Sequence, residues 1–288
     1  MLVATLIAAP GGLPPAVPAD LRARWSGGDL RWLSQDEAAE FAVATEPADL
    51  WEAWDHLQGQ GIDLLLQPAA HRRKRMLLAD MDSTMIRQEC IDELAVVAGV
   101  GEHVAAITAR AMNGEIGFEG ALRERVALLK DLRETVIDEV LRDRITYMPG
   151  GATLLATMKA QGAHAVLVSG GFLSFARPVA AHLGFHEARA NTLLAKDGKL
   201  TGEVQEPILG REAKVAALQE VTRRLNIGPQ DVLAVGDGAN DLGMLRLAGS
   251  GVALHAKPAV QAECRLRVNH GDLTALLYLQ GYAREEFA

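Results

Sequence analysis

The sequence predicts an α/β protein with a parallel sheet that carries helices on both faces, a Rossmann-like arrangement. Three observations support this prediction. The chain has 288 residues, 49% of them hydrophobic, which is enough for one large domain or two ordinary ones with a packed core. Short apolar runs have the composition of buried strands, and they lie at residues 76–80, 164–171, 231–238 and 251–254. Helical patterns at 151–162 and 211–226 lie between them, and such alternation is typical of parallel sheets.

The first seventy residues are interpreted as a separate small α+β domain. Apolar runs at 2–9, 30–33, 40–45 and 62–67 are predicted strands, and 18–25 and 47–61 are predicted helices. The resulting order, β-α-β-β-α-β, is that of a ferredoxin-like domain. The basic segment "AAHRRKR" follows, and directly before a buried strand we interpret it as a solvated connector rather than a nucleic-acid patch. The predicted domains are therefore residues 1–70 and 71–288.

Residues 88–148 interrupt the alternation directly after the first strand of the larger domain. They contain amphipathic helical patterns and no convincing strand. The patterns are "CIDELAVVAG", "HVAAITARAM", "FEGALRERVALLKDL" and "ETVIDEVLRDRI". An insertion of about sixty residues at this point predicts a helical cap over the edge of the sheet.

Composition limits the classes of partner. The net charge of −8 argues against nucleic acid, because binding to a phosphate backbone requires a basic surface, but it allows a small phosphorylated substrate held by local cations. The sparse cysteines, Cys90 and Cys264, suit a reducing compartment and are expected in the core. The apolar opening "MLVATLIAAP" has no basic region and is too short to span a bilayer, so we expect no membrane association and a cytoplasmic protein.

Three of the predicted strands end in polar residues. Asp80 and Asp82 follow the first, Ser169 and Gly170 the second, and "GDGAND" with Asp237 follows the third. Neighbouring parallel strands lie about 4.8 Å apart, and α/β proteins bind ligands at the carboxyl ends of their strands. We therefore expect these groups to converge on one ligand.

Hydrolysis of a phosphate monoester requires a nucleophile, an acid for the leaving oxygen and neutralisation of the phosphoryl charge. Asp80 could be the nucleophile and form an aspartyl-phosphate, while Asp82 could protonate the leaving alcohol and later deprotonate water. Asp80 with Asp237 could hold Mg²⁺. Ser169 and backbone N–H groups at Gly170 could bind phosphoryl oxygens, and Lys214 adds a positive charge at the start of a predicted helix.

Each of these groups alone has an ordinary structural explanation. Ser169–Gly170–Gly171 could be a turn, Lys214 a solvated helix residue and "GDGAND" an acidic loop. An EF-hand is excluded, because the loop lacks the spaced ligands and the glutamate at its twelfth position. The combination D-x-D-S-T, S-G-G, K and G-D-x-x-x-D, in this order, favours a phosphoryl-transfer site over those explanations.

This order of motifs resembles the haloacid dehalogenase superfamily of phosphatases. Over about residues 74–275, the segments "ADMDSTMIRQECIDELA", "TARAMNGEIGFEGALRERVALLK", "PGG", "VSGGF" and "VGDGANDLGML" are similar to the phosphoserine phosphatase family within it. The resemblance implies Mg²⁺-dependent hydrolysis of O-phospho-L-serine through an aspartyl-phosphate, the last step of serine biosynthesis. It also implies Asp80 as nucleophile and Asp82 as acid/base, with Mg²⁺ held by Asp80, Asp237 and the backbone carbonyl of Asp82.

The resemblance further assigns the substrate contacts. The residues implied for the phosphate are Ser169, Gly170, Lys214 and Asn240. In the cap, Glu89 and Arg125 match the positions that grip the amino and carboxyl groups, with Met112 and Phe118 closing over them. Physical chemistry agrees, because an ammonium favours a carboxylate and a carboxylate fits the planar fork of arginine. Glu89 could instead be a carboxylate at a helix N-terminus, and Arg123 is an alternative to Arg125.

The sequence leaves several alternatives open. A non-enzymatic phospho-acceptor, such as a response-regulator receiver, also pairs an acceptor Asp with acidic metal ligands, but it has no need of Asp82 or of a cap. A phosphatase for sugar phosphates or nucleotides and a phosphotransferase are the other candidates. Residues 1–70 could bind an amino acid, support a homodimer or have no regulatory role. Their removal is expected to leave activity largely intact, because every proposed catalytic group follows Arg75.

Overall fold

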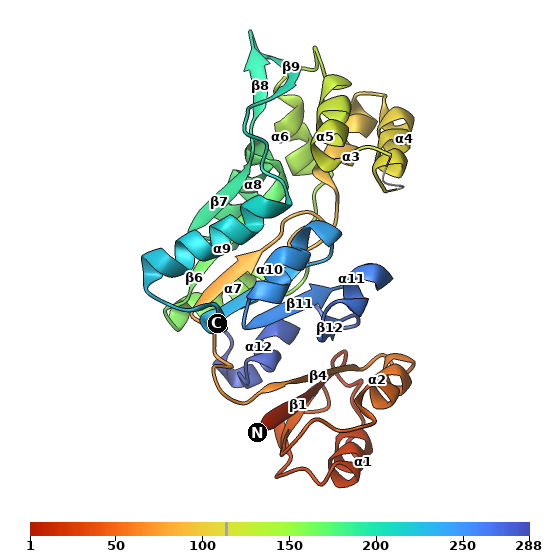
Figure 1. Cartoon of the computed structure of the whole chain (residues 1–288), viewed down its shortest axis with the longest axis vertical. Helices are drawn as coiled ribbons and strands as arrows, with labels where there is room; N and C mark the ends of the chain where they lie inside the picture. Colours follow the sequence, from red (N-terminus) through yellow and green to blue (C-terminus); the bar gives the residue numbers. More distant parts are fainter. Residues whose placement is uncertain (113–114) are drawn as a thin grey trace.

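The computed structural model describes residues 1–112 and 115–288. Three parts follow one another along its longest axis (Figure 1). The small N-terminal domain lies at one end, the large parallel sheet with its helices lies in the middle, and the cap lies at the other end. No helix among the described residues combines the length and the apolar character that crossing a membrane would require.

The central sheet has six parallel strands in the order β12-β11-β10-β5-β6-β7. Their bounds are β5 Met76–Ala79, β6 His164–Phe172, β7 Glu187–Asn191, β10 Val232–Gly236, β11 Ser250–Leu254 and β12 Leu266–Val268. This arrangement confirms the predicted fold class. The edge strands β7 and β12 were not predicted, because β7 is only partly buried along "EARAN" and β12 has three residues. Neither offers the apolar run by which the inner strands were recognised.

Helices cover both faces of this sheet, as predicted. Along β5, Leu77 and Ala79 face one hydrophobic core, whereas Met76 and Leu78 face the other, because successive side chains of a strand point to opposite sides. The helices packed on the first face are α7 Gly151–Ala160, α8 Leu173–Leu183 and α12 Ala275–Leu279. Those packed on the second face are α9 Arg211–Leu225, α10 Leu242–Leu247 and α11 Pro258–Ala262. Short 3₁₀ turns lie at Pro229–Asp231, Ala239–Asp241 and Arg284–Glu286.

The cap consists of the four helices expected from the insertion. Their bounds are α3 Cys90–Val97, α4 Gly101–Met112, α5 Phe118–Ala127 and α6 Val136–Asp143. A hairpin that the sequence did not predict, β8 Leu193–Lys196 and β9 Lys199–Val204, packs beside α5. The N–H of Asp131, just after α5, donates a hydrogen bond of 2.9 Å to the carbonyl oxygen of Leu200. The hairpin thus joins the cap although it comes from the later part of the chain.

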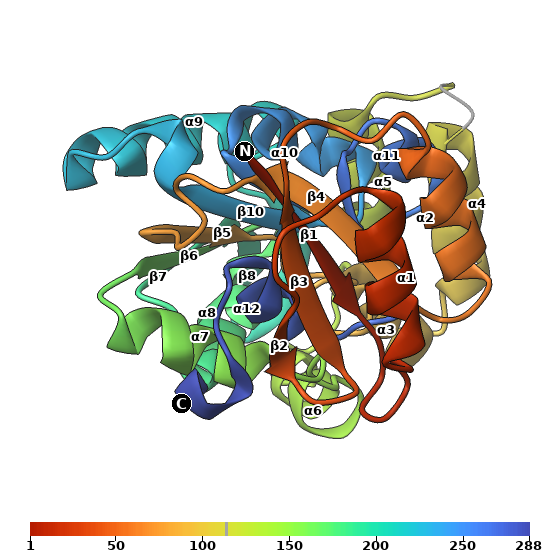
Figure 2. The same ribbon diagram turned by 90° about the horizontal axis from the view of Figure 1, so that it is seen from below.

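The N-terminal domain has the predicted β-α-β-β-α-β order. Its elements are β1 Leu2–Ile7, α1 Ala16–Arg24, β2 Arg31–Ser34, β3 Ala38–Val43, α2 Leu50–Gln58 and β4 Asp63–Pro68. The strands pair in the order β2-β3-β1-β4 and all neighbours are antiparallel. Figure 2 shows α1 and α2 side by side on one face of this sheet.

Candidate active site

Three acidic side chains meet at the carboxyl ends of β5 and β10. Carboxylate oxygens of Asp80, Asp237 and Asp241 all lie within 4.8 Å of one another. Asp80 directly follows β5, Asp237 directly follows β10, and Asp241 closes the 3₁₀ turn after it. Oxygen ligands in this number and at this spacing fit a divalent cation. Asp241 is the last residue of the "GDGAND" motif, and the sequence alone assigns it no role, because nothing local shows that its side chain turns back toward β5.

Lys214 is buried between two of these carboxylates. Its Nζ lies 2.7 Å from Oδ1 of Asp80 and 2.5 Å from Oδ1 of Asp241, and its side chain is 2% exposed. Burial acts to lower the pKa of Lys214, but the two carboxylates outweigh this effect and raise the pKa above its ordinary value. The lysine therefore stays charged and holds the Asp80 carboxylate in place. This position differs from that of a solvated helix lysine.

The pKa of Asp80 lies well above its ordinary value, because burial and the neighbouring Asp241 charge outweigh Lys214. Burial likewise raises the pKa of Asp237 to about 6. Thr84 donates a hydrogen bond of 3.2 Å to Oδ1 of Asp237, and the N–H of Gly238 donates one of 2.9 Å to Oδ2 of Asp241. The site thus gathers more negative charge than Lys214 alone compensates, which agrees with a cation bound between the carboxylates.

Asp82 lies beside this cluster and has a different set of partners. Its Oδ1 accepts a hydrogen bond from the N–H of Cys90 (2.9 Å) and its Oδ2 accepts one from the hydroxyl of Ser169 (3.0 Å). Burial raises the pKa of Asp82, against the effect of these hydrogen bonds. A carboxyl group with a raised pKa is suited to carry a proton during a reaction.

Ser169, Gly170 and Gly171 belong to the last residues of β6 and not to a separate turn. The ladder between β6 and β7 is interrupted after Val168 and resumes at Phe172, so this segment departs from regular pairing beside the site. A Cβ atom at Gly171 would lie 2.7 Å from Oδ2 of Asp82. Glycine therefore allows the strand to approach the acid/base candidate closely.

A cavity of about 690 Å³ lies between this edge of the sheet and the cap. Its volume is in the range of small-molecule sites. The predicted site residues in its wall are Asp80, Asp82, Glu89, Phe118, Arg125, Ser169, Gly170, Asp237 and Asn240. Lys214 lies behind Asp80, in contact with it.

Glu89 and Arg125 line the cavity from the side of the cap. Glu89 precedes α3 but makes no capping hydrogen bond with its side chain; instead its Oε1 accepts one of 2.8 Å from Ser83. The cavity walls remove enough water to raise the pKa of Glu89 to about 7, with the charge of Asp82 adding to this rise. The half-buried Arg125 donates from Nε to the carbonyl oxygen of Ala121 at 3.2 Å, which leaves the end of its guanidinium for a ligand.

Arg123, the alternative to Arg125, points elsewhere. It is exposed and forms ion pairs with Glu206 (2.7 Å) and Glu119 (3.3 Å). It is not part of the cavity wall, whereas Arg125 is. Because an α-helix has 3.6 residues per turn, two arginines that lie two positions apart in α5 point to different sides of the helix.

Phe118 extends from the start of α5 over the sheet edge. A Cβ atom placed at Gly170 or at Gly210 would lie 3.2 or 3.4 Å from its ring, so the ring covers both backbone positions. The side chain of Met112, which was expected beside it, lies outside the described residues. Both cysteines are buried and carry free thiols, as expected.

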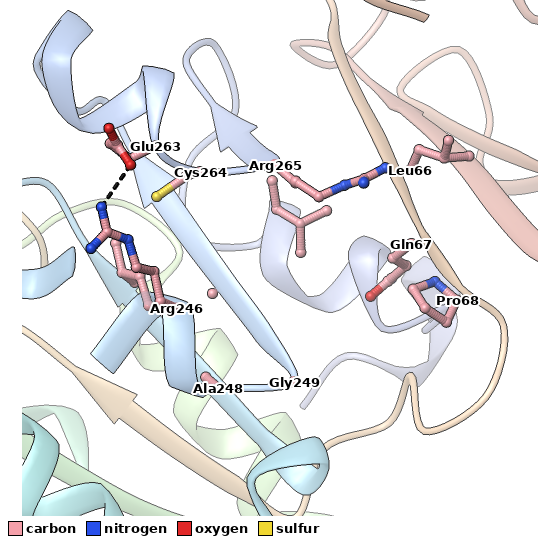
Figure 3. Close-up of a pocket in the computed structure, with 12 residues that line it drawn as sticks. Leu66, Gln67, Pro68, Arg246, Ala248, Gly249, Glu263, Cys264 and Arg265 are labelled. Atoms are coloured by element: carbon pink, nitrogen blue, oxygen red, sulfur yellow. Dashed lines mark hydrogen bonds and ion pairs between the residues drawn. The ribbon is translucent and has the colours of Figure 1, made fainter. Parts of the chain in front are cut away.

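A second cavity, of about 240 Å³, lies between β4 of the N-terminal domain and the segments around α10, β11 and β12 (Figure 3). The charged side chains in its wall are already paired: Arg246 with Glu263 at 2.6 Å and Arg265 with Glu46 at 2.5 Å. No chemical group in this wall resembles the cluster at the larger cavity.

Known proteins that resemble this chain include hydrolases and phosphatases. Residues 77–246 match the family model of haloacid dehalogenase-like hydrolases. The chain is 44% identical over 216 residues to a probable phosphoserine phosphatase from Schizosaccharomyces pombe, covering 74% of this chain and 72% of that protein. It spans only 59% of the length of a longer phosphoserine phosphatase from Streptomyces coelicolor.

Two solved structures resemble it. A HAD family hydrolase from Salmonella enterica serovar Typhi superposes with a TM-score of 0.87 at 29% identity, over 96% of this chain and 97% of that one. A phospho-aspartyl intermediate analogue of phosphoserine phosphatase superposes with a TM-score of 0.67 at 39% identity, over 72% of this chain and 98% of that one.

Proposed function

We propose that this chain, which belongs to the haloacid dehalogenase-like hydrolase family, hydrolyses O-phospho-L-serine to L-serine and phosphate and so catalyses the last step of serine biosynthesis. The observation that carries the proposal is a single cavity whose wall contains two kinds of group, one suited to phosphoryl transfer and one suited to binding an amino acid. The core side offers Asp80 and Asp82 for phosphoryl transfer, and the cap side offers Glu89 and Arg125, a charge pair complementary to an amino acid.

The first step forms an aspartyl-phosphate. A carboxylate oxygen of Asp80, held by Lys214 at 2.7 Å, attacks phosphorus, and the bond from phosphorus to the serine oxygen breaks. Asp82 gives its proton to that leaving oxygen, so L-serine departs as a neutral alcohol. The raised pKa of Asp82 favours the protonated form that this step needs, whereas Lys214, in direct contact with Asp80, favours the ionised form of the nucleophile.

The second step reverses the role of Asp82. Now a carboxylate, it takes a proton from a water molecule that attacks the aspartyl-phosphate, and the Asp80 carboxylate is released with inorganic phosphate. Before a substrate binds, the hydroxyl of Ser169 donates to Oδ2 of Asp82 and so orients the group that moves the proton; a bound phosphate would compete for the same hydroxyl hydrogen.

Asp80, Asp237 and the backbone carbonyl of Asp82 would hold Mg²⁺. The carboxylate of Asp241 lies in the same cluster and would be close to the ion. The ion supplies positive charge that offsets the negative charge of the phosphoryl group. Ser169, the N–H of Gly170, Asn240 and Lys214 are proposed to contact the phosphate.

The amino-acid part of the substrate is proposed to lie against the cap. Glu89 would bind its ammonium and the guanidinium of Arg125 its carboxylate, while Phe118 and Met112 would close over it. The division into residues 1–70 and 71–288, a homodimer and a cytoplasmic location also stay predictions.

Phosphate release from a panel of esters, with and without Mg²⁺, tests the proposal. We expect O-phospho-L-serine to be hydrolysed with a kcat/KM well above those of sugar phosphates, nucleotides and p-nitrophenyl phosphate, and only with the metal. A preference for a sugar phosphate or nucleotide would contradict the substrate. Stable phosphorylation of Asp80 without turnover would favour a phospho-acceptor, and transfer of the phosphoryl group from phosphoserine to an added alcohol in place of water would favour a phosphotransferase.

A further inference from the structure

A fourth strand end contributes to the active-site cavity. Beyond β11, the segment His255–Ala256–Lys257 brings Lys257 into the same wall as Asp237 and Asn240. Its side chain is exposed, and within the described part of the chain its ammonium forms no ion pair within 4.0 Å. The sequence alone does not distinguish this lysine, because "GVALHAKPA" has no acidic or hydroxyl residue where the strand ends.

The location of this cation matters because of the charges around it. Asp80, Asp237 and Asp241 crowd the core side of the cavity, and Lys214 is already bound to two of them. Even with Mg²⁺ bound as proposed, these carboxylates cancel much of the positive charge of the ion and of Lys214 that an incoming phosphate dianion would meet. A free ammonium in the wall beside Asp237 offsets part of that cancellation and offers the phosphate a charge-assisted hydrogen bond.

The segment that carries Lys257 is held in place by hydrogen bonds on both sides. The N–H of His255 donates to the carbonyl oxygen of Val268 at 2.8 Å, and its ring Nε2 lies 2.8 Å from the carbonyl oxygen of Gly271. The side-chain amide of Gln261 donates to the carbonyl oxygen of Ala256 at 2.7 Å. The position of Lys257 therefore depends on where residues 268–271 lie.

Residues 269–271 are in turn held by the N-terminal domain. Asp63, at the start of β4 and fully buried, accepts hydrogen bonds from the N–H groups of Asn269 (2.8 Å), His270 (3.1 Å) and Gly271 (2.8 Å). No Lys, Arg or His side chain within the described ranges pairs with this carboxylate, so the three N–H groups are its main hydrogen-bond partners. A buried carboxylate used in this way fixes the backbone of the loop.

Asn269 provides a second connection between the domains. Its Nδ2 donates to Oε1 of Gln58 in α2 at 2.8 Å and to Oε1 of Gln261 at 3.2 Å. Gln261 is the residue that holds Ala256, next to Lys257. The contacts form a continuous path from Asp63 and Gln58 in the N-terminal domain to the cavity wall.

We propose that Lys257 is an additional phosphate-binding residue of the active site, and that Asp63 is a positioning residue in the N-terminal domain that sets the segment carrying it. This inference rests on the proposed phosphatase function. It gives the N-terminal domain a part in substrate binding without a ligand of its own, and it predicts that removing residues 1–70 raises KM, contrary to the expectation from the sequence.

The first test compares Lys257→Met and Lys257→Arg, with Lys196→Met as the matched control at the exposed end of β8. Lys257→Met should raise KM for phosphoserine and for p-nitrophenyl phosphate alike, and the Kd of inorganic phosphate measured by calorimetry with Mg²⁺, by about ten-fold at low salt, with kcat changed by less than about two-fold. The difference should shrink as salt is added. Lys257→Arg should restore most of the affinity, and Lys196→Met should resemble the wild type.

An unchanged Kd for phosphate in Lys257→Met would overturn the assignment, as would an equal effect of Lys196→Met. Phosphate binding and p-nitrophenyl phosphate do not depend on the amino-acid part of the substrate. Failure of the phosphoserine proposal would therefore leave these readouts in place, and the two failures can be told apart.

The second test uses Asp63→Asn, which keeps the shape of the side chain but replaces one acceptor oxygen by a donor. We expect the same rise in KM and in the phosphate Kd, with a smaller amplitude, and no further change when it is combined with Lys257→Met. Gln261→Leu, which removes the bond to Ala256 without touching Asp63, should act in the same direction if Asp63→Asn does not fold. If Asp63→Asn raised the phosphate Kd by the same factor in the wild type and in Lys257→Met, Asp63 would not act through this lysine.

Discussion

Nζ of Lys214 lies 2.7 Å from Oδ1 of Asp80, and both side chains are almost entirely buried. The same ammonium contacts Asp241 at 2.5 Å, so one cation supports the nucleophile candidate and a carboxylate of the metal cluster together. The geometry of the site therefore depends on a residue that reaches it from α9.

Removal of the Lys214 charge should destabilise the fold. Lys214→Met leaves Asp80 and Asp241 buried without their cation, and breaking a buried ion pair costs about 3 to 5 kcal/mol. Unfolding in urea should show this loss in the free energy of unfolding, and turnover should be lost as well. Lys196→Met, with the same change in net charge, should leave the free energy of unfolding within about 0.5 kcal/mol of the wild type. A stable Lys214→Met variant would mean that the carboxylates are protonated in the folded protein.

Substitution of Asp80 and of Asp82 should affect turnover in different ways. Asp80→Asn should abolish turnover, because an amide is not a nucleophile. Asp82→Asn should spare metal binding, since its proposed metal contact is through the backbone, but slow turnover by about 10² to 10⁴. Steady-state kinetics and metal titration separate the two effects. Retention of more than a few per cent of activity in Asp80→Asn would exclude the covalent mechanism.

Glu89→Gln and Arg125→Ala should act on substrate choice. Loss of one partner of a desolvated charge costs about 2 to 5 kcal/mol, which is roughly 30- to 5000-fold in kcat/KM for phosphoserine. The loss should be small for p-nitrophenyl phosphate, which carries neither the ammonium nor the carboxylate.

Arg123→Ala is the matched control for these variants, because Arg123 is exposed and paired with Glu119 and Glu206 outside the cavity. It should change kcat/KM for either ester by less than about two-fold. Equal losses on the two esters in Glu89→Gln or Arg125→Ala would mean that these side chains support the cap and do not bind the amino acid.

The pH dependence should report Glu89. Its pKa is raised to about 7, so its carboxylate is charged above that pH and neutral below it. A neutral Glu89 cannot pair with an ammonium, and kcat/KM for phosphoserine should therefore fall as the pH drops through 7. The second ionisation of the phosphate, with a pKa of about 6, affects both esters, so p-nitrophenyl phosphate supplies the reference profile. The ratio of kcat/KM for phosphoserine to kcat/KM for p-nitrophenyl phosphate should fall below pH 7 in the wild type and should not vary with pH in Glu89→Gln. If the ratio in Glu89→Gln still falls below pH 7 as it does in the wild type, another group is titrating.

Metal binding should stabilise the folded protein. A ligand that binds only the native state raises the free energy of unfolding, by about 2.7 kcal/mol when its concentration is a hundred times Kd. Mg²⁺ should therefore raise Tm, and a chelator should reverse the rise and abolish turnover. In Asp237→Asn the rise should be much smaller, since a carboxylate of the cluster is lost. An equal rise in this variant would place the ion elsewhere.

The sequence by itself determined the features that depend on local order. The inner strands, the cap helices and the N-terminal β-α-β-β-α-β order all follow from the period of apolar residues. Asp80 and Asp82 could be singled out because they follow a buried strand and because the motifs S-G-G, K and G-D-x-x-x-D come after them in this order. The partly exposed strands β7, β8 and β9 and the three-residue strand β12 left too weak a pattern to be predicted.

Tertiary structure decided which distant groups meet. Only the packing of α9 shows that Lys214 joins Asp80 to Asp241, and only the orientation of α5 separates Arg125 from Arg123. The same holds for Lys257, whose segment is held through contacts that begin at Asp63, about two hundred residues earlier in the chain. Side-chain direction at a helix or loop depends on packing against elements far away in the sequence, and the local spacing of residues carries no record of that packing.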